Sequence, residues 1–180
     1  YYLLAANQGN AVAQGNIGHM YKRGQGVKQN YAKAMEYFQM AAKQEYARAQ
    51  TEIGVLYERG EVVRQDYTKA AEYYKLAANQ GEAEAQCKLG FLYEYGEGVT
   101  QDYTKAVEYY QMSASQGNAL AQFKLGYMYV NGKGVKQDYA KALGYYQMSA
   151  SQGNAFAQFG LGVMYECGEG VKQDYTKAER

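Results

Sequence analysis

The sequence contains no proline and no tryptophan, and it has only 2 cysteines and a single histidine, His19. Two cysteines are too few for a disulfide framework, and with one histidine they give no ligand set that has the spacing of a zinc site. No apolar run approaches the ~18 residues that a membrane span needs, so direct insertion into a membrane is not expected. The 19 Lys and Arg residues nearly balance the 18 Asp and Glu residues. A net charge of +1 gives no general attraction to nucleic acid, and we expect no nucleic-acid partner.

What the sequence has in abundance is self-similarity, together with 22 tyrosines and 21 glycines. A stretch reading A-x-A-Q-x-x-(I/L)-G-x-(M/L)-Y begins at five alanines that are 36 residues apart, and a glycine-rich turn follows it. Such periodicity is the signature of a repeat architecture. We therefore predict a single domain over residues 1–180. It contains the tail of one repeat (1–10), four full repeats (11–46, 47–82, 83–118 and 119–154) and a partial fifth (155–180).

Each repeat reads as two antiparallel helices, which we call helix A and helix B. In the third repeat we expect helix A over roughly Ala83–Glu94, ended by Gly96, because glycine accepts the left-handed conformation at a helix C-terminus. Helix B is expected over roughly Tyr103–Ser115, behind Asp102, whose carboxylate caps the free N–H groups of the first turn. All four aspartates of the chain occupy this cap, and Asn30 fills it in the first repeat. The pattern predicts an all-α fold with no aspartate left for chemistry.

A glycine recurs in the middle of every helix A, although a mid-helix glycine costs about 1 kcal/mol relative to alanine. We expect close approach of helix B to compensate, because the tyrosines of helix B need the space; in the third repeat these are Tyr103, Tyr109 and Tyr110. Much of the tyrosine excess is therefore expected to be packing. The glycines are Gly18, Gly54, Gly90, Gly126 and Gly162.

The repeated motif, continued through G-x-G-V-x-Q-D-Y-x-K-A-x-x-Y-Y-x-x-A-A-x-Q-G-N, resembles the Sel1-like repeat, a relative of the tetratricopeptide repeat. The resemblance covers the whole chain. It implies a right-handed superhelical α/α solenoid that acts as a scaffold or adaptor for other proteins, in bacterial envelope, signalling or host-interaction systems or in endoplasmic-reticulum quality control. The compartment stays open between periplasm, cell surface or secretion, and cytoplasm. Glu45-Tyr46 replaces the usual Gly-Asn and Val62 replaces a turn glycine, so we expect the local turns to shift at these two places.

The helix A positions that vary between repeats indicate where a partner binds. At ~100° per residue, positions 2, 5, 6, 9, 12 and 13 lie opposite the positions that hardly vary. Stacked helix pairs share a continuous core and leave one concave surface, so we predict that the variable face lines a groove for a partner peptide or helix. The alternative is that these positions are unconstrained solvated surface. The candidate binding residues are Arg23, Arg48, Glu52, Arg59, Lys88, Phe91, Tyr95, Lys124, Tyr127, Asn131 and Phe156.

The central stripe of this face also passes through His19 and Val55, and its character changes along the chain. We expect polar contacts in the first three repeats and an apolar anchor near Phe91, Tyr127 and Phe156, because arginine and aromatic side chains dominate interface energetics. Phe123 and Phe159 either extend this apolar area or pack between repeats.

The sequence does not favour an enzyme, a metal site or a cofactor. A lone histidine such as His19 is typical of a surface position. Glu52 and Glu84 are near enough in the repeat pattern for paired-carboxylate chemistry, but Arg48 and Lys88 flank them, and an ion-pair network explains all four residues.

The two ends of the sequence fall inside the repeat pattern. The chain opens without Met at Tyr1-Tyr2, so the native N-terminus is expected to be missing. Joined, the final DYTKAER and the initial YYLLAANQGN read as one helix B. Two interpretations remain: a segment of a longer array, or copies that stack head to tail through the split helix into an open filament.

Overall fold

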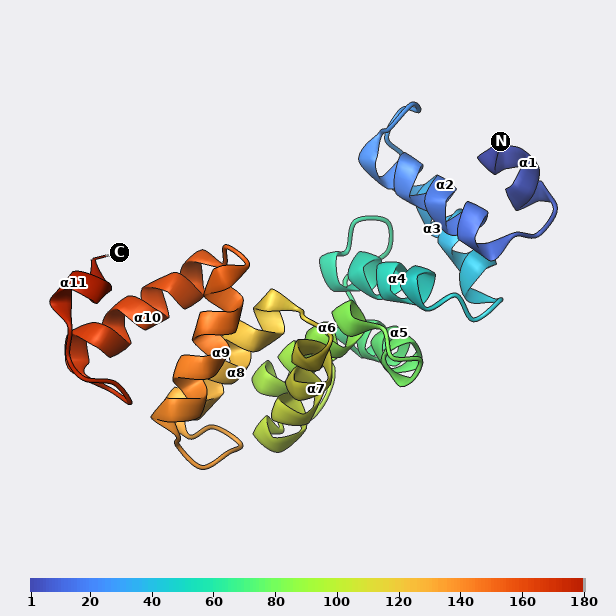
Figure 1. The fold of residues 1–180 in the computed structure, drawn as a ribbon. Helices are drawn as coiled ribbons and strands as arrows, with labels where there is room; N and C mark the ends of the chain where they lie inside the picture. The colour runs from blue at the N-terminus through green and yellow to red at the C-terminus, as the bar shows by residue number, and fades with distance from the viewer. Residues whose placement is uncertain (180) are drawn as a thin grey trace. The chain divides into compact units, whose positions relative to one another are not determined.

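A computed structural model describes residues 1–179, in which every regular element is an α-helix (Figure 1). Helices A and B alternate along the chain. The helices are α1 (Tyr2–Asn7), α2 (Ala11–Arg23), α3 (Tyr31–Ala42), α4 (Ala47–Arg59), α5 (Tyr67–Asn79), α6 (Ala83–Tyr95), α7 (Tyr103–Ser115), α8 (Ala119–Asn131), α9 (Tyr139–Ser151), α10 (Ala155–Cys167) and α11 (Tyr175–Ala178). The predicted all-α class and the alternation of two helices per repeat are confirmed.

The chain forms two compact units. The N-terminal unit consists of Tyr1–Ala85 with Glu97–Thr100, and the C-terminal unit consists of Gln86–Gly96 with Gln101–Arg180. Within each unit, helices that follow one another in sequence pack side by side (Figure 1). In each unit, a helix pair packs against the next pair. The cores of successive repeats therefore join into one core within each unit, as expected of stacked repeats.

Helix B begins at the expected cap in all five repeats. The side-chain oxygen of Asn30, Asp66, Asp102, Asp138 or Asp174 accepts a hydrogen bond from the backbone N–H three residues later, at 2.9–3.1 Å. Helix A is capped in the same way by Asn10, Asn118 and Asn154 and by Glu82, whose Oε2 accepts from the N–H of Ala85. These bonds satisfy donors that a helix N-terminus leaves free.

Four of the five mid-helix glycines face one aromatic ring of helix B, whereas an added Cβ on Gly162 would meet the backbone carbonyl oxygen of Ala178 at 3.3 Å. A Cβ on Gly18 would lie 2.5 Å from the ring of Phe38, and the same distance is 2.5 Å from Gly54 to Tyr74 and 2.4 Å from Gly126 to Tyr146. Ordinary carbon contacts need about 3.5–4.0 Å, so only glycine admits the ring. The space expected for three tyrosines in the third repeat belongs to Tyr110 alone, which faces Gly90.

The other helix B tyrosines have different roles. Tyr109 stacks on Tyr93 with the ring centroids 5.7 Å apart, and stacked pairs of the same kind join Tyr21 to Tyr37, Tyr57 to Tyr73 and Tyr129 to Tyr145. The first tyrosine of helix B instead accepts a hydrogen bond from a glutamine of the preceding turn. In the first repeat, Gln29 Nε2 donates to the Tyr31 hydroxyl at 3.0 Å and to the Lys22 carbonyl at 2.9 Å, which ties the end of helix A to the start of helix B.

Of the two irregular turns, the one at Val62 shifts as expected, whereas the one at Glu45 keeps the backbone conformation of the other repeats. Glu45 is the one non-glycine residue within 1–179 with a positive φ, 60°, because it stands where other repeats have glycine. Tyr46 follows it as the N-cap of α4 and makes no side-chain cap hydrogen bond. Val62 lacks the positive φ that Gly26, Gly98, Gly134 and Gly170 adopt at the same place in the turn.

Candidate functional site

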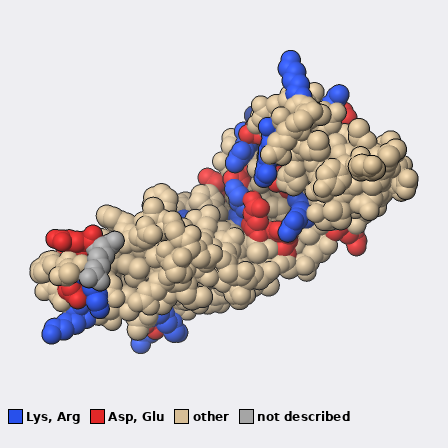
Figure 2. All heavy atoms as spheres, turned by 45° about the horizontal axis from the view of Figure 1, so that its top comes forward, with Lys and Arg blue, Asp and Glu red and all other residues tan. Residues whose placement is uncertain are grey.

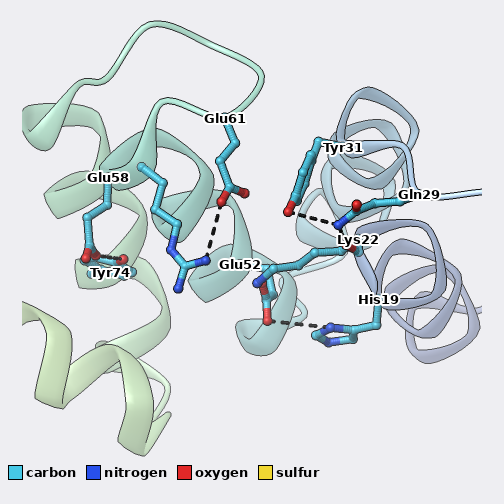
Figure 3. A network of polar contacts seen from close by, with 9 residues as sticks. His19, Lys22, Gln29, Tyr31, Glu52, Glu58, Glu61 and Tyr74 are labelled. Atoms are coloured by element: carbon cyan, nitrogen blue, oxygen red, sulfur yellow. Dashed lines mark hydrogen bonds and ion pairs between the residues drawn. The ribbon is translucent and has the colours of Figure 1, made fainter. Parts of the chain in front are cut away.

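In the N-terminal unit the helix A face is a network of charged side chains. Lys22 Nζ of α2 donates to Glu52 Oε2 of α4 at 2.5 Å, and both side chains are half-buried. Figure 3 shows His19 and Lys22 reaching from α2 toward Glu52. Lys and Arg side chains lie beside Asp and Glu side chains over this part of the unit (Figure 2). The face is therefore electrostatically mixed, as the sequence indicated.

His19 is more enclosed than its prediction as a surface residue implied. Its ring packs edge-on against Phe38, with the centroids 5.2 Å apart. Nδ1 is buried without a hydrogen-bond partner within residues 1–179 and lies 3.6 Å from Glu52 Oε1. Burial lowers the pKa of His19 below its usual value of 6.5; Glu52 opposes this shift, and the nearby positive charges of Arg23, Lys22 and Arg48 reinforce it.

The remaining predicted residues of the N-terminal unit fall into two groups. Arg23 and Arg48 are exposed, whereas Arg59 makes an ion pair with Glu61 of the following turn, NH1 to Oε1 at 3.4 Å. The prediction that Val55 lies on the exposed stripe is wrong, because α4 packs it to 4% exposure. Glu52 contacts Lys22 and His19, in line with the expected ion-pair network, and its pairing with Glu84 stays a prediction.

In the C-terminal unit a buried carboxylate organises the same face. Glu94 of α6 is 3% exposed, and its Oε2 accepts from the Tyr110 hydroxyl at 2.6 Å and from Lys124 Nζ at 3.1 Å. Burial, the hydrogen bond to Glu94 and the negative charge of that residue raise the pKa of Tyr110 well above its usual range. Tyr110 therefore stays protonated and keeps donating to the carboxylate.

Lys124 also binds two aromatic residues of α6. Its Nζ lies 5.1 Å from the centroid of Phe91 and 5.0 Å from that of Tyr95, and it donates to the Tyr95 hydroxyl at 3.1 Å. Phe91 and Tyr95 themselves touch, with centroids 4.4 Å apart. Three predicted residues therefore form one cluster, and Lys88 lies half-buried on the same helix.

A separate apolar cavity of about 330 Å³ opens between α8, α9 and α10. Tyr127, Asn131 and Phe156 line it, as do Phe123 and Phe159. Phe156 is 70% exposed and Phe159 is 74% exposed, while Phe123 stacks on Tyr146 and touches Phe156 at 5.7 Å between centroids. The expected apolar anchor is thus divided, because Phe91 belongs to the Lys124 cluster and not to this cavity.

Three polar residues of the candidate site were not predicted from the sequence. Glu94 and Lys22 both stand at position 12 of helix A, beside the stripe but outside its centre, and Lys133 lies in the turn after α8. Lys133 Nζ donates to the Tyr127 hydroxyl at 3.2 Å, a contact that raises the pKa of Lys133. A signal was available for the first two, because position 12 of one repeat and position 6 of the next carry opposite charges in Lys22–Glu52 and Glu94–Lys124.

Two kinds of site are absent from the described residues. Within residues 1–179, no group of three or more His, Cys, Asp and Glu side chains is placed to hold a metal ion. None of the helices in this part of the chain combines the length and apolar character that crossing a bilayer requires.

Comparison with known proteins identifies the repeat. The Sel1 repeat profile matches residues 1–10, 11–46, 47–82, 83–118, 119–154 and 155–180. The chain belongs to the Sel1 repeat family. Sel1 repeat proteins are generally non-catalytic scaffolds for protein interactions. A search of curated proteins gives no match.

Solved structures share the Sel1 repeat solenoid fold. A protective antigen of uropathogenic Escherichia coli, c5321, is 36% identical with a TM-score of 0.92, over 99% of this chain and 40% of that one. A Sel1 repeat protein of Oxalobacter formigenes is 35% identical with a TM-score of 0.87, over 96% of this chain and 71% of that one. The immunity protein Pa5087 of Pseudomonas aeruginosa is 26% identical with a TM-score of 0.66, over 99% of this chain and 68% of that one. The chain thus spans 40% of the length of the E. coli antigen.

Proposed function

We propose that this Sel1 repeat protein is a scaffold that binds segments of partner proteins along the helix A face. An apolar side chain of the partner enters the cavity lined by Tyr127 and Phe156. The observation that carries the proposal is this cavity of about 330 Å³ with two largely exposed phenylalanines at its wall. Its volume lies at the small end of the range of ligand pockets and suits a side chain better than a cofactor.

The surroundings of the cavity support binding because they are held in place before a partner arrives. Lys133 binds the Tyr127 hydroxyl, and the Asn131 side chain donates to the Tyr127 carbonyl at 2.8 Å. Tyr146 is 5% exposed, and burial raises its pKa to about 12, so the floor beneath Phe123 stays neutral and apolar. A preorganised site loses less conformational entropy when it binds.

The proposal can be tested with peptides selected from a random 12-residue phage library on the immobilised protein. We expect the selected peptides to carry an aromatic or large aliphatic residue. In calorimetric titration, Tyr127→Ala combined with Phe156→Ala should weaken their binding about thirtyfold, because losing a central aromatic contact costs about 2 kcal/mol or more.

Gln111→Ala is the matched control, because Gln111 is an exposed residue of α7, a helix B. The control should bind the selected peptides as the wild type does. Equal affinities for the double variant and the control would reject the cavity as the binding site. A pull-down of natural partners with the same variants, read by mass spectrometry, would then identify the biological ligand.

A second candidate is self-association. The two parts of the split helix B expose apolar side chains: Tyr2, Leu3 and Leu4 on α1, and Tyr175 on α11. Contact between such surfaces of two copies would be heterologous and would build an open assembly. Light scattering tests this candidate, because a mass that stays monomeric at all concentrations would remove it.

A further inference from the structure

The helix A face of the N-terminal unit concentrates positive charge around one carboxylate. Lys22 and Arg23 stand at the end of α2, and Arg48 stands one turn before Glu52 on α4. Lys22 and His19 both contact Glu52, Arg23 follows Lys22 in the chain, and Arg48 precedes Glu52 by one helical turn, so the three basic residues belong to the same face. Figure 2 shows basic side chains over this part of the unit with acidic side chains among them. Glu52 is the carboxylate that contacts this cluster, through Lys22 and His19.

Glu52 neutralises Lys22 and leaves the two arginines unpaired. The carboxylate of Glu52 is engaged by Lys22 through Oε2 at 2.5 Å and faces His19 through Oε1 at 3.6 Å (Figure 3). Within residues 1–179, neither Arg23 nor Arg48 has a side-chain hydrogen bond or an ion pair. Arg59 differs, because Glu61 pairs with it.

The exposed and unpaired guanidinium groups of Arg23 and Arg48 are suited to bind carboxylates. Each guanidinium carries five N–H donors in a planar fork that matches a carboxylate, and the charge-assisted bonds that it forms are stronger than neutral ones. A nucleic acid is a poorer match, because its affinity grows with the number of phosphates that cations neutralise, whereas this face offers two unpaired arginines and the whole chain has a net charge of only +1. The chemistry therefore favours carboxylates carried by a protein.

We propose that the α2–α4 face of the N-terminal unit binds an acidic segment of a partner protein, with Arg23 and Arg48 as the residues that contact its carboxylates. This inference rests on the proposed scaffold function and names the chemistry of the segment that this unit takes. It uses no residue of the apolar cavity in the C-terminal unit, so the two sites can fail separately.

Fluorescence anisotropy with a fluorescein-labelled peptide of eight alternating Glu and Asp residues tests the proposal on the full chain. Arg23→Gln combined with Arg48→Gln should weaken binding of this peptide at least tenfold at about 50 mM salt. The matched control is Lys28→Gln combined with Arg64→Gln, which removes the same charge from exposed residues of the same unit. The control should change the affinity less than twofold. Equal weakening by both pairs would overturn the proposal, because net charge alone would then explain binding.

A gain-of-binding variant gives a second, independent result. Glu52→Gln removes the carboxylate that occupies Lys22, so the acidic peptide should bind severalfold more tightly than to the wild type. Glu36→Gln, at an exposed position of α3, removes the same charge elsewhere and should have a smaller effect. Equal tightening by both variants would count against a local site.

Two further arms separate this site from its alternatives. A 12-nucleotide oligothymidylate should bind more weakly than the peptide, and tighter binding of the oligonucleotide would overturn the assignment to a protein partner. Tyr127→Ala with Phe156→Ala should leave binding of the acidic peptide unchanged. If these cavity substitutions abolished binding of the acidic peptide, the α2–α4 site would be rejected.

Discussion

Replacing glycine with alanine should destabilise this protein at one helical position and stabilise it at another. Gly126 lies inside α8 against the ring of Tyr146, and an added Cβ would sit 2.4 Å from a ring carbon. Gly144 lies inside α9, and nothing would come within 4 Å of its added Cβ. Both glycines belong to the C-terminal unit, so the same core responds to both changes.

The magnitudes follow from two opposing effects. Replacing a mid-helix glycine with alanine favours the helix by about 1 kcal/mol, and this is the whole effect expected for Gly144→Ala. In Gly126→Ala the buried ring must move by about 1 Å to restore an ordinary contact. Overpacking of this kind costs about 1–3 kcal/mol, and a shift this large belongs at the upper end. We therefore expect a net loss of about 2 kcal/mol for Gly126→Ala.

Thermal unfolding followed by circular dichroism measures the difference. At about 2–4 °C per kcal/mol for a chain of this size, the Tm of Gly144→Ala should rise by about 3 °C and that of Gly126→Ala should fall by about 6 °C. Unchanged far-ultraviolet spectra at 20 °C would show that both variants keep their helices. A Gly126→Ala variant as stable as the wild type, or a shift of both variants in the same direction, would contradict the proposed close packing of Tyr146 against Gly126.

Three other substitutions probe separate features of the fold. Glu45→Gly should raise the free energy of unfolding by about 1 kcal/mol in urea titration, because glycine adopts a positive φ without the strain of a side chain; a loss of stability would contradict this. Glu94→Gln should lower the free energy of unfolding by about 2 kcal/mol, because Lys124, only 13% exposed, would lose the carboxylate that balances its charge. An unchanged urea midpoint would contradict this expectation. His19→Gln should flatten the pH dependence of the free energy of unfolding. Burial lowers the pKa of His19 in the folded protein, so the wild type is most stable above the unfolded pKa of about 6.5. As the pH falls below that value, the wild type should lose stability by no more than about 1.4 kcal/mol per pH unit. Identical slopes for the two proteins between pH 7.5 and 5.5 would contradict the last expectation.

Local structure could be predicted from the sequence because its causes are local. A cap depends on one side chain and the N–H groups two or three residues later, so Asp102 indicated the start of α7 correctly. Helix A of the third repeat was expected to end at Glu94, and α6 ends one residue later, at Tyr95. The mid-helix glycines of helix A also predicted that helix B packs closely against them. The sequence did not show which of three tyrosines would contact Gly90.

The details of the candidate site depended on contacts between repeats, which a helical wheel does not contain. The wheel gives the direction of a side chain from its own helix, so Val55 and Phe91 were placed on the same open stripe. Packing buries Val55 and places Lys124 over Phe91. The enclosure of His19 by Phe38 and Glu52 has the same origin.

We propose that the helix A face binds a partner protein through the apolar cavity of the C-terminal unit. The most direct measurement is a calorimetric titration of one library-selected peptide against the wild type, against Tyr127→Ala with Phe156→Ala, and against Gln111→Ala. Binding to the cavity variant should be about thirtyfold weaker, and Gln111→Ala should bind with wild-type affinity. The same dissociation constant for all three proteins would contradict it.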